Sequence, residues 1–112
     1  MSGISTHVLD VSIGQPAAEI QVALERSIDG DWQPIAFKPT DADGRCKELL
    51  SEEKVVAGSY RLVFDTGSYF FRTARATLYP EVYIAFTVAD DGASYHIPLL
   101  LSPFGYSTYR GS

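Results

Sequence analysis

The sequence predicts an all-β protein in which two antiparallel sheets pack together with one short helix. Short segments that alternate apolar and polar residues recur along the chain, and this period is that of strands with one buried face. Clusters of Gly, Pro, Asp and Ser separate these segments at short intervals, as in β-sandwiches. With 112 residues, of which 46% are hydrophobic and 21% charged, we expect one globular domain over residues 1–112.

The first half of the chain contains three expected strands. Turn-forming residues bound the first, residues 6–12, and the third, residues 32–38. Between them, residues 19–26 alternate apolar and polar side chains in steps of two, which predicts a strand with one dry face. A turn is expected at residues 41–44, because Asp and Gly tolerate left-handed backbone there.

One helix is expected in the second half, around residues 68–75. Asp65 or Thr66 can cap its start, since short polar side chains satisfy the free N–H groups of a first turn. Pro80 lies beyond it and prevents the helix from continuing that far. The helix is therefore expected to be short.

Four more strands are expected around this helix. Residues 60–65 and 82–88 alternate clearly and are rich in β-branched and aromatic residues. Residues 94–101 and 106–109 are bounded by turn residues. The pair Asp91-Gly92, between two strand-like segments, is the strongest hairpin signal in the chain. The sequence thus predicts about seven strands.

Composition excludes several classes of partner. Nine Lys and Arg against fourteen Asp and Glu give a formal charge of −5, so no basic surface for nucleic acid is expected. The apolar run at residues 97–101 is far shorter than the roughly 20 residues that span a bilayer, so no membrane anchor is expected. Residues 1–10 lack the features of a signal peptide, and the single Cys46 cannot form an internal disulfide. We therefore expect a cytoplasmic protein.

Two histidines, His7 and His96, lie inside expected strands and are candidates for chemistry. One interpretation is that they are structural and satisfied by backbone hydrogen bonds. Another is that they transfer protons, because imidazole titrates near neutral pH, at about 6.5. A third is a zinc site with Cys46 as a further ligand, but no ligand pair has the usual spacing. No metal site and no cofactor are predicted.

Arg45 and the C-terminal segment complete the candidates. Arg45 directly follows the turn at residues 41–44; it is either a solvated charge or a binder of an anion or a developing oxyanion. Residues 103–112 are rich in aromatic and hydroxyl side chains, which is unusual for a frayed tail. They form either a final edge strand or part of a site, to which Tyr106 and Tyr109 contribute contact area.

Several stretches, spread from one end of the chain to the other, share one family pattern. They are residues 5–10, 14–17, 43–45, 79–82, 95–103 and 106–112. In these stretches the sequence resembles the 5-hydroxyisourate hydrolases of the transthyretin-related family. The most specific stretch is the terminal Tyr109-Arg110-Gly111-Ser112, which separates these hydrolases from the hormone carriers of the same fold.

This resemblance implies a transthyretin-like sandwich that assembles as a homotetramer, a dimer of dimers, with sites in the channel between dimers. It implies ring-opening hydrolysis of 5-hydroxyisourate, the unstable product of urate oxidation, to 2-oxo-4-hydroxy-4-carboxy-5-ureidoimidazoline. One histidine then activates water as general base, while the other orients the water or protonates the departing ring nitrogen, and the arginine stabilises the oxyanion. The implied catalytic residues are His7, Arg45, His96 and Ser112, and the implied substrate-binding residues are His7, Arg45, Tyr109, Arg110 and Gly111.

Two other functions remain as alternatives. A carrier of the same fold would bind an aromatic molecule in the channel without turnover, but His7, Arg45, His96 and Tyr109 would leave polar groups unpaired against an apolar ligand. An adhesion or accessory module would have no small-molecule site. It would leave the histidines and the tail without a common purpose.

Overall fold

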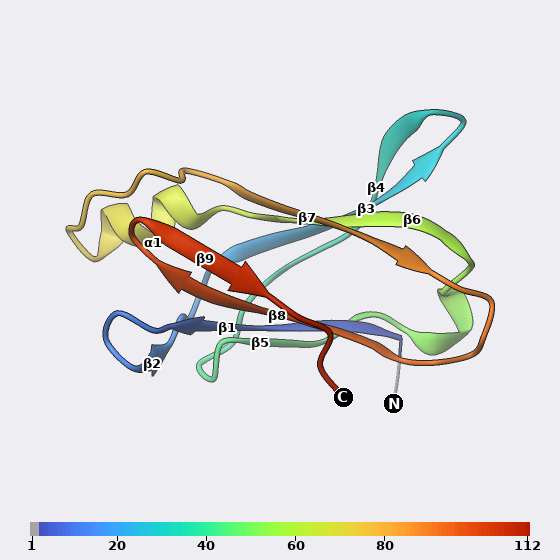
Figure 1. Ribbon diagram of the computed structural model, residues 1–112, viewed down its shortest axis with the longest axis horizontal. Coiled ribbons are helices and arrows are strands. Elements are labelled where there is room, and N and C mark those ends of the chain that lie inside the picture. The colour runs from blue at the N-terminus through green and yellow to red at the C-terminus, as the bar shows by residue number, and fades with distance from the viewer. Residues whose placement is uncertain (1–2) are drawn as a thin grey trace.

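The computed structural model describes residues 3–112, and over this range the chain folds into two layers of strands (Figure 1). Residues 1 and 2 of the expected domain lie outside the described residues. The strands are β1 (Ile4–Asp10), β2 (Gln15–Pro16), β3 (Gln21–Ile28), β4 (Asp31–Pro39), β5 (Arg45–Leu50), β6 (Gly58–Phe64), β7 (Val82–Val88), β8 (Tyr95–Ser102) and β9 (Gly105–Thr108). A 3-10 turn, η1 (Glu52–Lys54), and one helix, α1 (Thr66–Arg72), complete the described elements.

One sheet has the strand order β4-β3-β6-β7. In the other, β1 pairs with β2 and β5 on one side and with β8 on the other, and β8 pairs with β9. The prediction of a two-sheet sandwich with one short helix is confirmed. No helix among residues 3–112 is long and apolar enough to cross a membrane.

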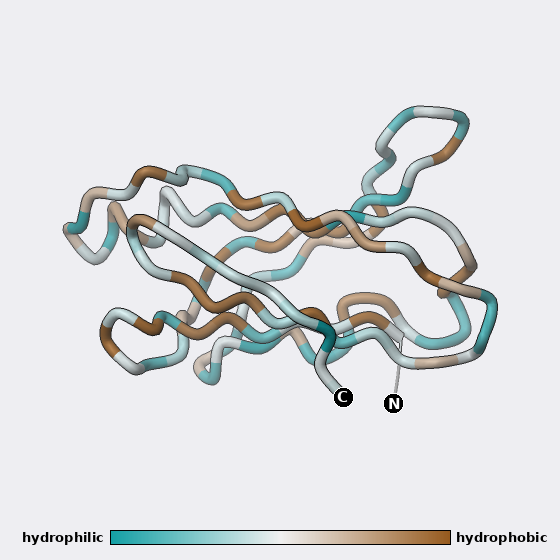
Figure 2. The backbone as a smooth tube through the Cα atoms, in the orientation of Figure 1, coloured by the Kyte–Doolittle hydropathy of each residue, from teal (hydrophilic) through white to brown (hydrophobic). Residues whose placement is uncertain are grey.

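The core lies between the sheets and is formed by alternate residues of the strands. In β6, Tyr60, Leu62 and Phe64 are fully buried, whereas Arg61 and Val63 point to the outer face and are only partly covered. In Figure 2, hydrophobic segments interrupted by more polar ones recur along the strands of both layers. The outer faces of the sheets are therefore free to hold polar side chains.

All seven expected strands are present, but two strands were not predicted. β2 is only two residues long, and β5 does not alternate, because Lys47 and Glu48 are both exposed while Leu49 and Leu50 are both buried. A strand without a period of two gives no signal in the sequence.

The hairpin predicted at Asp91-Gly92 is wrong. The preceding strand, β7, pairs with β6, whereas the following strand, β8, pairs with β1 and β9 in the other sheet. Gly92 does adopt a left-handed backbone, with φ of 67°, so the turn chemistry is present. The turn at Asp91-Gly92 connects two strands of different sheets rather than the two strands of a hairpin. Asp and Gly are typical of both kinds of connection.

The sandwich is also not wholly antiparallel. β1 and β8 run parallel over their length, from the pair Ile4 and Tyr95 to the pair Asp10 and Leu101. Both ends of the described chain meet the start of β8, because Gly3 accepts a hydrogen bond from Tyr95 and Gly111 donates one to His96 (Figure 1). This junction positions the candidate site.

The helix α1 begins as expected, with Asp65 as its cap. The Asp65 carboxylate accepts a hydrogen bond of 3.1 Å from the Ser68 N–H. The helix ends at Arg72, so residues 73–75 of the expected stretch lie outside it, and Ala74 adopts a left-handed backbone with φ of 58°. It is thus shorter than the proline alone would require.

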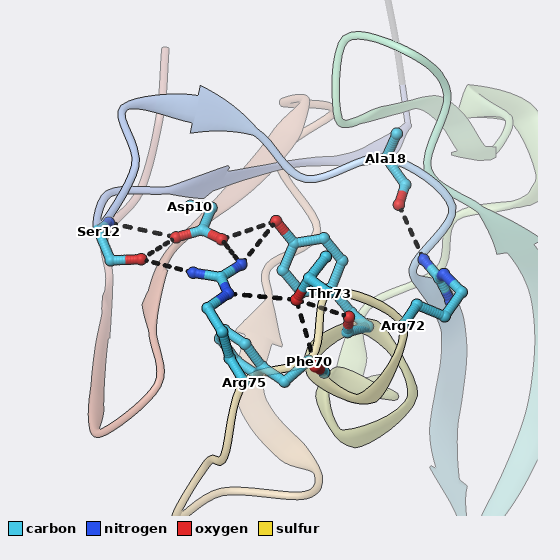
Figure 3. A network of polar contacts seen from close by, with 8 residues as sticks. Asp10, Ser12, Ala18, Phe70, Arg72, Thr73 and Arg75 are labelled. Carbon is cyan, nitrogen blue, oxygen red and sulfur yellow. Dashed lines mark hydrogen bonds and ion pairs between the residues drawn. The ribbon is translucent and has the colours of Figure 1, made fainter.

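A buried polar cluster anchors the α1 end of the molecule to β1 (Figure 3). The fully buried Asp10 accepts hydrogen bonds of 2.6 Å from both Tyr69 and Arg75, and Ser12 donates to its other oxygen. Burial by itself would raise the pKa of Asp10, but its hydrogen bonds, that from Arg75 foremost, outweigh burial and hold the pKa below its ordinary value. The cluster fixes the end of the strand that also carries His7.

Candidate active site

A pocket of about 290 Å³ opens on the outer face of the sheet formed by β5, β1 and β8. Its lining residues come from these strands, the approach to β8 and the C-terminal tail: Ser5, Thr6, Arg45, Lys47, Ser94, His96 and Ser112. The fold thus brings together three of the predicted catalytic residues, Arg45, His96 and Ser112, which are far apart in the sequence.

Strand register explains how these side chains meet. In the antiparallel pair of β1 and β5, His7 lies opposite Arg45, and in the parallel pair of β1 and β8, Ser5 lies opposite His96. Residues two apart in a strand share a face, so Ser5 and His7 point to the same side. Both imidazoles and the guanidinium therefore occupy one face of the sheet. His7 lies beside the pocket rather than in its lining.

The imidazole of His96 is held on two edges. The Ser5 hydroxyl lies 2.8 Å from Nδ1, and the backbone of Gly111 packs so closely that a Cβ there would come within 2.5 Å of Cδ2. Burial foremost, then the positive charge of Arg45, and then that of His7 when its ring is protonated, lower the pKa of His96. The ring is therefore neutral at neutral pH.

His7 is held differently. Its Nε2 lies 2.9 Å from the backbone carbonyl oxygen of Asp43. A carbonyl oxygen only accepts, so Nε2 carries a proton and the neutral ring has its lone pair on Nδ1. His7 is thus arranged to accept a proton at Nδ1.

The turn before β5 positions Arg45. The Asp41 carboxylate accepts hydrogen bonds from the backbone N–H groups of Arg45, at 3.0 Å, and Asp43, at 2.9 Å. Gly44 adopts a left-handed backbone with φ of 77°, as the predicted turn requires. Within residues 3–112 the Arg45 guanidinium makes no hydrogen bond or ion pair. Its planar set of donors is available for an anion.

The C-terminal tail continues from β9 alongside β8. Thr108 donates a hydrogen bond of 2.7 Å to the Pro98 carbonyl, and Gly111 donates one of 2.8 Å to the His96 carbonyl. These contacts deliver Ser112 to the pocket.

Tyr109 and Arg110 line a second, more apolar groove of about 270 Å³ beside Ile84 and Phe86 of β7. The Arg110 guanidinium lies 4.5 Å from the centre of the Tyr95 ring, so it contributes to holding the tail. In the single chain these two residues do not line the pocket of His96. Their role in binding substrate stays a prediction.

Cys46 lies apart from the histidines. It is fully buried on the opposite face of β5 from Arg45, and its thiol contacts the Pro39 carbonyl at 3.5 Å. Burial raises the pKa of the Cys46 thiol to about 11. The thiol therefore does not complete a zinc site with the histidines, and residues 3–112 contain no cluster of three or more His, Cys, Asp or Glu that suits a metal ion.

Sequence reasoning missed four lining residues, Ser5, Thr6, Lys47 and Ser94. Ser5 lies two positions before His7, and Lys47 lies two after Arg45, so the rule that alternate strand residues share a face indicates both once the strands are known. β5 gave no such signal. Ser94 lies two positions before His96 in the expected strand at residues 94–101, so the same rule indicates it, although β8 itself begins at Tyr95.

The fold and the site define a transthyretin-like β-sandwich with a polar pocket on the face of one sheet. The chain belongs to the HIUase/Transthyretin family, whose sequence model matches residues 4–111. It is 43% identical over 109 residues to a 5-hydroxyisourate hydrolase of Salmonella typhimurium, and this match covers 97% of this chain and 80% of the relative. It is 39% identical over 113 residues to the 5-hydroxyisourate hydrolase of Mus musculus, covering 99% and 96% of the two chains.

Solved structures have the same fold. Transthyretin from Sparus aurata superposes with a TM-score of 0.94 at 30% identity, over 99% of this chain and 97% of that chain. A 5-hydroxyisourate hydrolase from Klebsiella pneumoniae superposes with a TM-score of 0.86 at 38% identity, over 100% of this chain and 94% of that chain. Because a transthyretin and a 5-hydroxyisourate hydrolase share this fold, the fold alone does not decide the function, and the site has to be considered.

Proposed function

We propose that this protein hydrolyses 5-hydroxyisourate. Water adds to a ring carbonyl, the adjacent carbon–nitrogen bond breaks, and the product is 2-oxo-4-hydroxy-4-carboxy-5-ureidoimidazoline. The observation that supports this most strongly is the convergence of Arg45, His96 and the terminal Ser112 on one pocket. Relatives of this chain with about 40% identity over nearly its full length are named 5-hydroxyisourate hydrolases.

His7 acts as the general base in this proposal. Its Nε2 proton is engaged by the Asp43 carbonyl, which leaves Nδ1 to take a proton from the attacking water. The same carbonyl stabilises the imidazolium that forms, since it accepts a hydrogen bond more strongly from a charged ring. The imidazolium then returns the proton to the departing ring nitrogen, so the protons balance.

Arg45 stabilises the oxyanion that develops as water adds. It lies opposite His7 across the β1 and β5 pair, and its guanidinium has no protein partner within residues 3–112. A preorganised donor of this kind is worth about 10²–10³-fold in rate. His96 remains neutral and donates a hydrogen bond from Nε2 to the substrate, and Ser112 closes the pocket beside it.

The polar lining also separates hydrolysis from carriage of an apolar ligand. Arg45, Lys47 and His96 all line the pocket, and an apolar molecule would leave them desolvated and unpaired. A planar, polar purine derivative supplies the carbonyl and N–H groups that they require. This favours the hydrolase over the carrier, the alternative with the same fold.

We propose a homotetramer, a dimer of dimers, as the working form, with residues 1–112 as one domain. β7 and β9 are edge strands, and the apolar groove between them holds Tyr109 and Arg110. Edge strands with apolar neighbours are commonly covered by a second copy.

The unpaired, buried Cys46 suits the reducing cytoplasm. The negative charge of −5 disfavours nucleic acid and acidic membrane surfaces as partners.

The test is a stopped ultraviolet assay in which urate oxidase supplies fresh 5-hydroxyisourate and its absorbance decay is followed with and without the protein. We expect the wild-type protein to accelerate the decay strongly. This acceleration should be lost in His7→Ala and strongly reduced in His96→Ala, while both variants elute from size exclusion at the position of the wild type. Decay at the spontaneous rate in the presence of folded wild-type protein would reject the hydrolase and favour the carrier.

A further inference from the structure

We infer that Ser5 is a positioning residue for His96: its hydroxyl donates a hydrogen bond to Nδ1 and thereby keeps the ring proton on Nε2, the nitrogen left for the substrate. What this proton does in catalysis rests on the proposed hydrolysis. What Ser5 does to the ring rests on the geometry of β1 and β8 alone.

The parallel pairing of β1 and β8 creates this contact. Ser5 and His96 are register partners, although 91 positions separate them in the sequence. Register partners in a parallel pair point to the same face, and here the oxygen lies 2.8 Å from Nδ1, an ordinary hydrogen-bond distance. Both residues are half-buried and line the same pocket. The contact is therefore built into the backbone register.

The direction of the hydrogen bond follows from counting donors. The Ser5 hydroxyl has one proton, and His96 Nδ1 is its hydrogen-bond partner within residues 3–112. If Nδ1 carried the ring proton, the hydroxyl would accept and its own proton would be left without a protein acceptor in a half-buried position, which costs free energy. With a neutral ring, the arrangement that satisfies both groups has Ser5 donating and the ring proton on Nε2.

The opposite edge of the ring is blocked by the tail. The backbone of Gly111 packs against Cδ2, and its N–H donates to the His96 carbonyl at 2.8 Å. Ser5 occupies Nδ1 and Gly111 covers Cδ2, so Nε2 is the nitrogen that remains for a ligand. Ser5 and the tail together fix both the orientation of the ring and its tautomer.

The experiment compares wild type with Ser5→Ala and Ser5→Thr, and uses Ser59→Ala as a matched control. Ser59 is an exposed serine on the outer face of the other sheet. Long-range ¹H–¹⁵N spectra of the histidine rings read the tautomer directly, without substrate. We expect His96 in the wild type to have an unprotonated Nδ1 and a protonated Nε2. In Ser5→Ala we expect a mixture of tautomers, because the hydroxyl that favours one of them is gone.

Kinetics provide the second readout. A hydrogen bond made mainly in the transition state affects kcat rather than KM, so we expect Ser5→Ala to lower kcat about tenfold with KM within about twofold. Ser5→Thr keeps the hydroxyl and should restore kcat to within about twofold, while Ser59→Ala should match the wild type. A purely structural role would not produce rescue by threonine together with a changed tautomer.

Three results would overturn the inference: a wild-type His96 protonated on Nδ1, a Ser5→Ala spectrum identical to that of the wild type, or an unchanged kcat in folded Ser5→Ala. If Ser5→Ala fails to fold, the wild-type spectrum decides by itself. Failure of the proposed function has a different signature, namely a wild-type protein that does not accelerate substrate decay while its His96 spectrum shows the expected tautomer.

Discussion

Gly111→Ala tests how tightly the C-terminal tail is packed against the catalytic imidazole. A Cβ at this position would lie 2.5 Å from Cδ2 of His96, whereas ordinary contacts begin near 3.4 Å, so a gap of about 0.9 Å must open. The His96 carbonyl, at 3.4 Å, is not overlapped. The strain therefore falls on the ring, which rotates away from Ser5, or on the tail, which lifts Ser112 from the pocket.

Either movement disturbs the reacting groups by close to 1 Å. A misplacement of this size costs up to about 10²-fold in rate, and we expect kcat to fall about 10- to 100-fold. The free energy of unfolding should change by less than about 1 kcal/mol, because the site is next to the chain end and the tail can yield. The stopped ultraviolet assay measures the first quantity, and urea denaturation measures the second.

Gly105→Ala is the matched control, since it lies at the start of β9, upstream of the same tail. A Cβ there would meet only the Ser102 hydroxyl, at an ordinary 3.8 Å. We expect wild-type kinetics from this variant. Wild-type kcat in Gly111→Ala, with the His96 ring signals unmoved, would refute the argument that the tail fixes the ring.

Two further predictions concern charge. Burial first, and then Arg45, lower the pKa of His96, so Arg45→Gln should raise that pKa toward its ordinary value in an NMR titration and lower kcat about 10²–10³-fold; an unmoved pKa would place Arg45 away from the ring. The folded-state pKa of Asp10 is depressed, so its ionisation stabilises the fold above a pH of about 4, the ordinary carboxyl value, and this stability is lost as pH falls through the depressed pKa. Asp10→Asn should therefore lower the free energy of unfolding by about 1–3 kcal/mol at pH 7, a modest value because its partner Arg75 is partly solvated. The loss should become smaller as the pH falls. Equal urea midpoints for both proteins at pH 7 would contradict this.

Much of the fold was predictable because most strands bury one face. β3, β6 and β7 alternate clearly, and the helix start was set by a local cap, Asp65, which needs no information from distant residues. β5 escaped prediction because paired leucines follow paired polar residues. The false hairpin at Asp91-Gly92 has a more general cause, since turn residues report that the chain bends and not which sheet it enters next.

The site was predictable in its members but not in its contacts. His7, Arg45 and His96 were found by residue type and by resemblance, whereas Ser5 became visible only once β1 and β8 were known to run parallel in a register that places Ser5 opposite His96. Parallel pairing joins distant segments without a tight turn, so no local pattern marks it. The same limit applies to Gly111, whose importance comes from a close approach to His96 rather than from an unusual backbone.

The different roles of the two imidazoles follow from the different partners that the fold provides. His7 faces a backbone carbonyl, which can only accept, so its proton lies on Nε2 and its lone pair on Nδ1. His96 faces a hydroxyl, which has a proton to give, so Nδ1 accepts and Nε2 is left as a donor. A base and a hydrogen-bond donor thus lie on one sheet face although both are histidines. Since the protonation of each ring is set by the atom that it faces, exchanging the partners, rather than the histidines, is what would reverse their roles.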